Sequence, residues 1–227
     1  MDISNIKISN HNKNFFIPSI MEPDREESQQ FLNSKILSDA LVKTIINPDK
    51  LFYISNVNDY FPKTTKLVNE LLQPAKLRIR EASMFVANGS AKVNRLHCDA
   101  LGYKNKIYML EARFSFYSLT KASGLISWWD TDANVVLETG PVIVDGKQVS
   151  TWMGYISEWS RKQLRWDQIP DPQHTISTDI PSGFVRTNLP HTVFQGDGQR
   201  ITISYMIVDL ETGNPHGVWE RVRNFYG

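Results

Sequence analysis

The run Arg200-Ile201-Thr202-Ile203-Ser204-Tyr205-Met206 alternates two kinds of side chain, residue by residue. Successive side chains of an extended strand point to opposite faces, so alternate residues of this stretch fall into a polar set and an apolar set. One face carries Ile201, Ile203 and Tyr205, and the other carries Arg200, Thr202, Ser204 and Met206. A buried charge without a partner is strongly destabilising. The stretch therefore predicts a β-structure whose inner face is polar because it binds a polar group.

Similar alternating runs, separated by Gly, Asn, Asp and Pro, occupy the chain from Lys76 onward. We predict strands at Lys76–Ala87, Lys106–Leu119, Gly124–Trp129, Pro141–Val144, Gly183–Thr187, His191–Phe194 and Arg200–Val208. Many short strands at this spacing are typical of a sandwich or a barrel. Prolines interrupt residues 154–181, which we expect to form either an active-site lid or a passive surface loop.

The N-terminal part has a different texture. After a short strand at Asn14–Ile20, apolar residues recur at helical spacing over Glu22–Ile46, with Asp24 and Glu27 arranged as a capping box. We predict a helix there, a short strand at Leu51–Ser55 and a second helix over Lys63–Leu72. A final short helix or tail is expected at Val218–Phe225.

These elements predict one mainly β domain with N-terminal helices over residues 1–227. Residues 1–75 form its helical support, 76–210 the β core and 211–227 a C-terminal tail. The chain is 41% hydrophobic and 22% charged, which is typical of a globular protein long enough to bury a sizeable core.

The charge and the cysteine content bear on the binding partners and the cellular compartment of the protein. Lys and Arg number 25 and Asp and Glu 24, so the net charge of +1 gives no overall field that would attract nucleic acid or anionic lipid. The single cysteine, Cys98, cannot form an internal disulfide, which favours a reducing compartment. No secretory signal and no long apolar run is recognisable. We expect a soluble cytoplasmic protein without a membrane partner.

His97-Cys98-Asp99 and His191 are the candidate metal ligands. In an extended segment His97 and Asp99 share one face, and Cys98 points the other way. Two imidazoles and one carboxylate form the facial triad of non-haem Fe(II) oxygenases. Other interpretations remain open: a loop salt bridge between His97 and Asp99, or a turn cap formed by His191. Likewise, Arg200 could pair with Asp197 across the adjacent hairpin turn.

The pattern His97-x-Asp99, a distant His191 and then Arg200-x-Thr202 resembles the 2-oxoglutarate and Fe(II)-dependent dioxygenase superfamily. The resemblance covers roughly 76–210 and is closest to small prolyl-hydroxylase-like or phytanoyl-type members. It implies a double-stranded β-helix, that is, a jelly-roll or cupin-like core. It also implies that Fe(II) binds His97, Asp99 and His191.

A co-substrate site follows from the same resemblance. Arg200 would grip the distal carboxylate of 2-oxoglutarate bidentately, with Thr202 or Ser204 donating a further hydrogen bond. Arg113, Ser115 and Tyr117 share one face of a neighbouring strand and are the remaining candidates for co-substrate contacts. Alternatively, Tyr117 is a core tyrosine, and Arg113 pairs with Glu111 or Glu81.

The resemblance implies an oxygenase, most simply a hydroxylase, that uses O₂ and converts 2-oxoglutarate to succinate and CO₂. The substrate would be a small molecule or a single residue of a larger one. Asp99 argues against halogenation, because related halogenases replace this carboxylate with Gly or Ala; desaturation and ring closure stay open. Two alternatives are a non-catalytic jelly-roll module that binds a sugar, nucleotide or small acid, and a cupin-type metalloenzyme that does not use 2-oxoglutarate.

Five of the six tryptophans lie in one short part of the chain: Trp128, Trp129, Trp152, Trp159 and Trp166. Adjacent residues of a strand face opposite sides, so either one of Trp128 and Trp129 lies in the core and the other at a surface or pocket, or, as the favoured alternative, both are hydrophobic residues that seal the sheet. The basic and aromatic residues from Trp159 to Trp166 form either a rim helix that recognises an anionic or planar group or a solvated helix.

Overall fold

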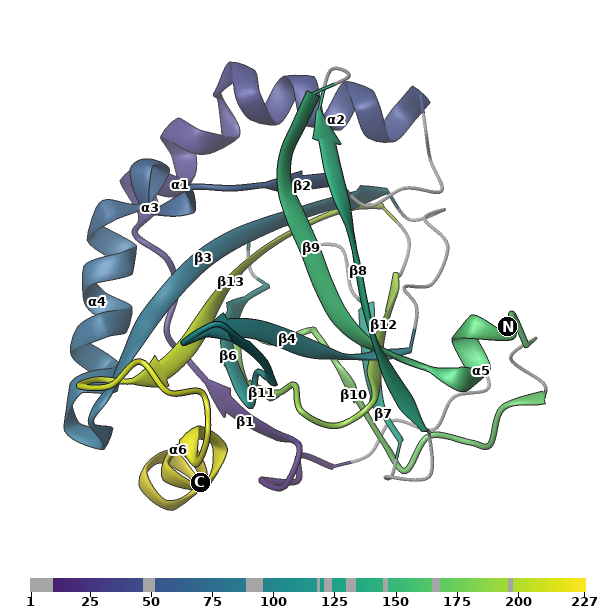
Figure 1. The fold of residues 1–227 in the computed structure, drawn as a ribbon. Coiled ribbons are helices and arrows are strands. Elements are labelled where there is room, and N and C mark those ends of the chain that lie inside the picture. Colours follow the sequence, from purple (N-terminus) through teal and green to yellow (C-terminus); the bar gives the residue numbers. More distant parts are fainter. Residues whose placement is uncertain are drawn as a thin grey trace.

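The computed structural model describes residues 10–46, 52–88, 96–117, 119–120, 124–129, 134–144, 147–164, 168–195 and 198–227. Two antiparallel sheets dominate it (Figure 1). The first sheet has the order β1-β11-β6-β13-β3-β2, and the second has the order β10-β7-β12-β4-β9-β8, with β5 paired to β4.

The strands of the first sheet are β1 (Phe16–Ser19), β2 (Phe52–Ile54), β3 (Leu77–Asn88), β6 (Ala112–Phe116), β11 (Ser182–Arg186) and β13 (Gln199–Asp209). Those of the second are β4 (His97–Tyr103), β5 (Lys106–Met109), β7 (Gly124–Trp128), β8 (Val135–Val144), β9 (Lys147–Ser157), β10 (His174–Ser177) and β12 (His191–Gln195).

From β3 onward the chain crosses repeatedly between the two sheets. β3, β6, β11 and β13 belong to the first sheet, and β4, β7, β10 and β12 belong to the second. Eight strands divided in this way form a jelly-roll, so the predicted fold class is confirmed. The β8–β9 hairpin lies between β7 and β10 in sequence and extends the second sheet beyond β4 (Figure 1).

Several predicted boundaries in the β core were wrong. The strand predicted at Lys106–Leu119 is two strands, because the chain leaves the second sheet after β5 and enters the first at β6. The strand predicted at Pro141–Val144 is only the end of β8. β9 and β10 were not predicted. The segment 154–181 contains the end of β9, the short helix α5 (Glu158–Arg161) and β10.

The N-terminal part forms α1 (Arg25–Leu32), α2 (Lys35–Ile46), β2, α3 (Val57–Tyr60), α4 (Pro62–Leu72) and a 3₁₀ turn at Gln73–Ala75. The single helix predicted over Glu22–Ile46 is thus two helices. α1 ends at its C-cap, Asn33. The next residue, Ser34, caps α2, because its hydroxyl accepts a hydrogen bond from the backbone N–H of Leu37. Strands β1 and β2 also show that this part adds to the first sheet as well as covering it.

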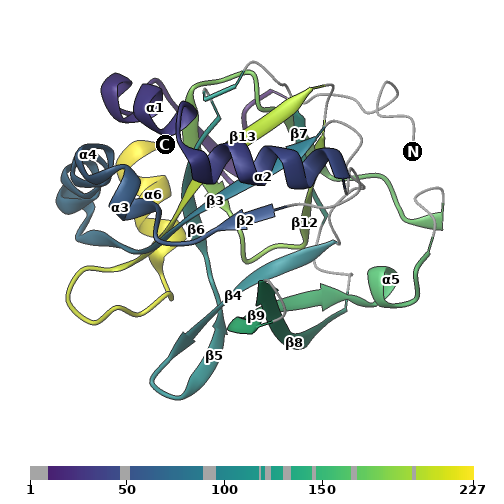
Figure 2. The same ribbon diagram turned by 90° about the horizontal axis from the view of Figure 1, so that it is seen from above.

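The helices cover the outer face of the first sheet. α2 lies across β2 and β3 (Figure 2), and α6 (Val218–Tyr226) packs near β13. The apolar face of β13, with Ile201, Ile203 and Tyr205, is buried in the same cluster as Phe31 of α1 and Val68 of α4. The alternation predicted for β13 is therefore confirmed on its apolar side. None of the helices in the described part of the chain has the length and apolar character that crossing a bilayer requires.

Glu27 joins two of these helices. The carboxylate of Asp24 caps α1 as predicted, accepting from the N–H of Glu27 at 3.0 Å, but Glu27 does not complete a capping box. Its buried carboxylate instead accepts from the backbone N–H groups of Lys63 and Thr64, at 2.5 and 2.9 Å, and from the Thr64 hydroxyl at 2.7 Å. Glu27 thus satisfies the free N–H groups at the start of α4.

Glu27→Ala should lower the free energy of unfolding by about 2–3 kcal/mol, because buried donors at the start of α4 lose their acceptor. Denaturant titration measures this change. Glu26→Ala is the matched control on the same helix, since the contacts of Glu26, an ion pair with Lys63 and a hydrogen bond from Gln30, are solvent-exposed and their removal should leave stability nearly unchanged. Equal stability of the two variants would contradict the capping role of Glu27.

Candidate active site

A cavity of about 830 Å³ lies between the two sheets. Its floor is the polar face of β13 with the flanking strands β3 and β6, and residues from these strands form rows across the first sheet. The rows are Glu81–Met206–Arg113, Ser83–Ser204–Ser115, Phe85–Thr202 and Ala87–Arg200. The polar face predicted from the sequence is therefore the floor of an internal cavity.

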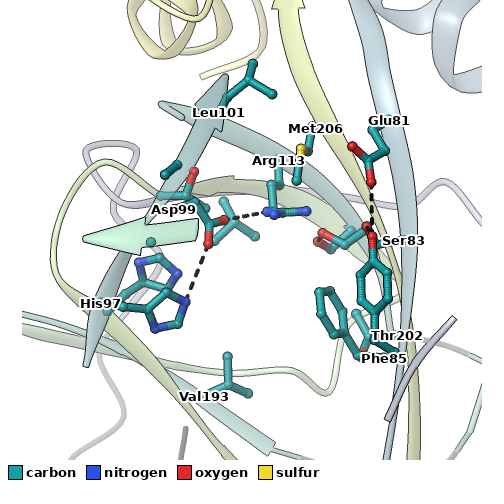
Figure 3. Close-up of a pocket in the computed structure, with 18 of the residues that line it drawn as sticks. Glu81, Ser83, Phe85, His97, Asp99, Leu101, Arg113, Val193, Thr202 and Met206 are labelled. Carbon is teal, nitrogen blue, oxygen red and sulfur yellow. Dashed lines mark hydrogen bonds and ion pairs between the residues drawn. The ribbon is translucent and has the colours of Figure 1, made fainter. Parts of the chain in front are cut away.

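The second sheet brings the three predicted metal ligands together. His97 and Asp99 lie two residues apart on β4, and His191 on β12 is paired directly with His97. One ligand atom from each residue lies within 4.8 Å of the others, and the two imidazole centroids are 4.7 Å apart. Figure 3 shows His97 and Asp99 on one side of the cavity. The contact between His97 and Asp99 that was considered as a loop salt bridge does exist, but the two residues belong to a strand.

Hydrogen bonds select the atoms that each residue presents. His97 Nε2 lies 3.4 Å from Asp99 Oδ1, and Arg113 Nε donates to Asp99 Oδ2 at 2.5 Å. His191 Nδ1 lies 2.9 Å from the carbonyl oxygen of Leu189, so Nε2 is the ring nitrogen that His191 can offer to a metal ion. Since this contact fixes the ring, the turn-capping role considered for His191 and a ligand role are compatible.

Protonation states in the cluster suit a cation. Burial, together with the neighbouring His97, lowers the pKa of His191 to about 4, so this imidazole is neutral at pH 7. Burial alone would raise the pKa of Asp99, but the guanidinium of Arg113 and the imidazole of His97 outweigh it and hold that pKa below its usual value. A carboxylate and a neutral imidazole are the forms that bind metal ions.

Arg113 and Asp99 link the two sheets. Arg113 extends from β6 in the first sheet to Asp99 on β4 in the second, so neither of the partners predicted for it, Glu111 and Glu81, is its ion-pair partner. Glu111 instead accepts from the backbone N–H of Trp219 at the start of α6. Arg113 Nη1 is buried and has no hydrogen-bond partner among the described residues.

Arg200 and Tyr117 line another part of the cavity. Arg200 is only 6% exposed, and its Nε donates to Thr202 Oγ1 at 3.1 Å. Its Nη1 and the Tyr117 hydroxyl are both buried, and neither has a partner within the described residues. The guanidinium carbon lies 5.7 Å from the centroid of the Tyr117 ring. Asp197, considered as an ion-pair partner of Arg200 across the hairpin turn, is outside the described residues.

Gly124 on β7 leaves room for that guanidinium. A Cβ atom at this position would lie 3.0 Å from Arg200 Nη1 and 2.8 Å from the carbonyl oxygen of Phe194. Burial disfavours the charged form and lowers the pKa of Arg200, and it raises the pKa of Tyr117 to about 12. The Tyr117 hydroxyl is therefore a donor at neutral pH. Arg200 Nη1 and the Tyr117 hydroxyl, both buried and without an acceptor among the described residues, form a site for an anionic group.

The remaining candidate residues also have definite places. Ser115 and Ser204 line the cavity and hydrogen-bond to each other at 2.9 Å. Cys98 is buried away from the cavity, as predicted from alternation, and burial raises the pKa of its thiol to about 12.

None of the tryptophans whose side chains the structure describes lines the cavity. Trp128 and Trp129 are both buried, and their indole N–H groups donate to the carbonyl oxygens of Arg186 and Pro170. Their burial agrees with the alternative that both seal the sheet, and the interpretation that one of them faces a surface or pocket was wrong. Trp159 packs against the cluster around Trp129. Trp166 is outside the described residues, and the side chain of Trp152 is not described.

Sequence reasoning assigned no binding role to several residues that line the cavity. These are Tyr53, Arg80, Glu81, Ser83 and Phe85. Alternation along the predicted strand Lys76–Ala87 could have placed Glu81, Ser83 and Phe85 on one face. For Tyr53 and Arg80 no local pattern was available, because one lies on a three-residue edge strand and the other at an irregularity of β3.

Comparisons with family models and with curated proteins found no match. Similar solved structures include HygX from Streptomyces hygroscopicus with nickel and 2-oxoglutarate bound, at 12% identity and a TM-score of 0.41 over 85% of this chain and 81% of that chain. The epimerase SnoN in complex with Fe3+, alpha ketoglutarate and nogalamycin RO is 12% identical, with a TM-score of 0.41 over 86% of this chain and 78% of that chain. The viral collagen prolyl hydroxylase vCPH from Paramecium Bursaria Chlorella virus-1, as a 2OG complex, is 12% identical, with a TM-score of 0.32 over 85% of this chain and 93% of that chain.

Arg113→Gln should lower the free energy of unfolding by about 3 kcal/mol at neutral pH, because it leaves Asp99 as an uncompensated buried carboxylate. The pKa of Asp99 is lowered in the folded protein, so the stability from this pair is present above the unfolded pKa of about 4 and is lost as the pH falls below it. Denaturant titration at neutral and acid pH should therefore show the difference between the proteins shrinking in acid.

Arg161→Gln provides the control for this prediction. It breaks an ion pair with Glu138 that is much more exposed, so the loss of stability should be far smaller. If Arg113→Gln were no more destabilising than Arg161→Gln at neutral pH, the buried pair between Arg113 and Asp99 would not exist.

Proposed function

We propose that this protein is an Fe(II)- and 2-oxoglutarate-dependent oxygenase that hydroxylates a C–H bond of a small molecule or of a single residue. The observation that carries this proposal is the combination of two sites in one cavity. A His-Asp-His group lies at one site, and at the other lie the buried Arg200 Nη1 and Tyr117 hydroxyl, which have no hydrogen-bond partner among the described residues.

The donor set fits Fe(II). His97, Asp99 and His191 offer two imidazole nitrogens and one carboxylate oxygen from adjacent strands, the set that non-haem iron oxygenases use. Arg113 holds one Asp99 oxygen, and the contact with Leu189 orients His191, so the ligand atoms are positioned before a metal binds. Bound Fe(II) would supply the redox chemistry that activates O₂ while 2-oxoglutarate is converted to succinate and CO₂.

Arg200 and its neighbours fit the co-substrate. The guanidinium would bind the distal carboxylate of 2-oxoglutarate, and the Tyr117 hydroxyl would donate to the same group. Thr202 holds Arg200 Nε, which fixes the plane of the guanidinium. The hydroxyls of Ser115 and Ser204, which already share one hydrogen bond, can contact the co-substrate from the floor. Arg113 Nη1 remains as a buried donor for a carboxylate near the metal ligands.

Apolar side chains of the second sheet and of the cavity floor would exclude water from the cavity. Ile126 and Val193 contribute apolar side chains to the cavity, and Phe85 does so from β3. Apolar walls exclude water and strengthen the electrostatic contacts of the charged groups between them. The presence of Asp99 as a third ligand favours hydroxylation over halogenation.

Anaerobic addition of Fe(II) and 2-oxoglutarate should produce the weak visible absorption band of a metal chelate with a 2-oxo acid. His97→Ala and Asp99→Ala should abolish the band because each removes one metal ligand. His216→Gln, which changes an exposed histidine outside the cavity, should leave it unchanged. Absence of the band from the unmodified protein at saturating ligand would refute the proposed cofactor site.

Arg200→Gln should weaken 2-oxoglutarate binding roughly 10- to 100-fold and leave metal affinity unchanged, because a charge-assisted contact is lost at a site remote from the ligands. Calorimetric titration with 2-oxoglutarate measures this change. The control ligand is 2-oxobutyrate, which lacks the distal carboxylate and should bind both proteins equally. Unchanged 2-oxoglutarate affinity would show that Arg200 is not the anchor.

Succinate formation separates this proposal from a module that only binds an acid at Arg200. The iron-loaded protein should convert 2-oxoglutarate to succinate slowly even without its substrate. A binding module would produce none, although its affinity for 2-oxoglutarate could be the same. A metalloenzyme that does not use 2-oxoglutarate would show neither turnover nor any effect of Arg200→Gln.

A further inference from the structure

Two consecutive charged residues, Arg80 and Glu81, both line the cavity. In a regular strand such neighbours would point to opposite faces. The pairing of β3 with β13 shifts at this point, since Met206 is opposite Glu81 and Ile207 is opposite Ile79. Arg80 is thus the extra residue of a β-bulge, which re-aims side chains locally. The bulge explains how both charges reach the cavity.

Neither charge is neutralised by the described part of the protein. Within those residues Arg80 makes no side-chain hydrogen bond and no ion pair, and the two neighbours do not pair with each other. The carboxylate of Glu81 has one polar contact, in which the Tyr53 hydroxyl donates to Oε1 at 3.0 Å. Both side chains are solvent-exposed, so a cation and an anion lie where the cavity opens to solvent and remain available to a ligand.

Glu81 is held in a defined position. The Tyr53 hydroxyl has a single proton, which it donates to Glu81, so the Ser83 hydroxyl donates to Tyr53 over their 2.9 Å contact. Ser83 is fully buried, and the Tyr53 ring makes an edge contact with Phe85, with centroids 5.7 Å apart. This chain of contacts orients the carboxylate of Glu81, although the residue is solvent-exposed.

The pair lies within reach of the proposed metal site. Glu81, Met206 and Arg113 are adjacent on three neighbouring strands, and Arg113 contacts Asp99. Neighbouring strands are about 4.8 Å apart, so Glu81 and Arg113 are separated by roughly 10 Å of sheet. Figure 3 shows Glu81 and Asp99 on opposite sides of Arg113. A small molecule bound at Glu81 could extend over Met206 toward the metal ligands.

The charged residues of the cavity wall indicate the kind of ligand. The described cavity wall carries five charged residues: Arg80, Glu81, Asp99, Arg113 and Arg200. Asp99 pairs with Arg113, and the proposed function assigns Arg200 to 2-oxoglutarate. The two that remain have opposite charges on consecutive residues. They match a ligand that carries an ammonium and a carboxylate on the same carbon atom.

We propose that the substrate is a free α-amino acid, whose ammonium group binds Glu81 and whose carboxylate binds Arg80. This inference rests on the proposed function. The amino-acid side chain would extend toward His97, Asp99 and His191. There a C–H bond is replaced by C–OH: one oxygen atom of O₂ enters the hydroxyl group, and the other enters the succinate formed, with CO₂, from 2-oxoglutarate.

Ligand-observed NMR with the twenty standard L-amino acids tests this proposal on the protein loaded with Zn(II) and 2-oxoglutarate. At least one amino acid should bind, and its N-acetyl and carboxamide derivatives should bind at least about tenfold more weakly, because each lacks one of the two charges. Succinate formation by the iron-loaded protein should rise with the same amino acid. If none of the twenty binds, or if the derivatives bind equally well, the proposal is wrong.

Matched variants assign the two charges. Glu81→Gln keeps an acceptor for Tyr53 and should weaken binding of the amino acid about tenfold or more, without affecting its N-acetyl derivative. Arg80→Gln should do the same without affecting the carboxamide. Glu211→Gln and Arg25→Gln remove the same charges at exposed positions outside the cavity and should change nothing. Equal affinity in Glu81→Gln and the unmodified protein would overturn the assignment.

The outcome for this inference is separable from that for the proposed function. If the Fe(II) and 2-oxoglutarate band forms but no amino acid binds, only the substrate assignment fails. If the band does not form, the oxygenase proposal itself fails, whichever amino acids bind.

Discussion

The pairing of β13 between β3 and β6 is the constraint on which the rest of the structure depends. Both faces of β13 are covered, one by the helices and one by the second sheet. A slip of one residue would therefore place Arg200 among Phe31 and Val68 and turn Ile203 toward the cavity. Because such a slip would bury a charge in an apolar core, the register is strongly specified. The rows of the cavity floor follow from that register.

The metal-ligand cluster depends on contacts between the sheets as well as within them. β4 supplies His97 and Asp99, β12 supplies His191, and the first sheet supplies Arg113 to hold Asp99. The ion pair between Asp99 and Arg113 spans the sandwich, so the position of one proposed ligand is tied to the packing of the sheets. The same packing leaves Arg200 Nη1 buried without a partner in the described part of the chain, which a folded protein tolerates where a ligand compensates the charge.

Local rules predicted the helices less well than the strands of the core. The apolar spacing over Glu22–Ile46 continued through the break at Asn33, because both helices bury their faces against the same sheet. Asp24 and Glu27 had the spacing of a capping box, yet Glu27 caps α4, whose start is more than thirty residues away in the chain. Spacing cannot reveal such a contact, since it depends on where the two helices dock.

The sequence by itself determined the jelly-roll class, the two faces of β13 and the candidate set His97, Asp99, His191 and Arg200. Period-two alternation, a local property of the chain, indicated a sandwich or barrel and the two faces of β13, whereas the jelly-roll class and the candidate set were implied by the resemblance that the short motifs carry. The tertiary structure decided that Arg113 pairs with Asp99, that Trp128 and Trp129 are both buried, and that Arg80 and Glu81 share the cavity. Those outcomes depend on a bulge and on pairing between distant strands, which exist only once the two sheets have formed.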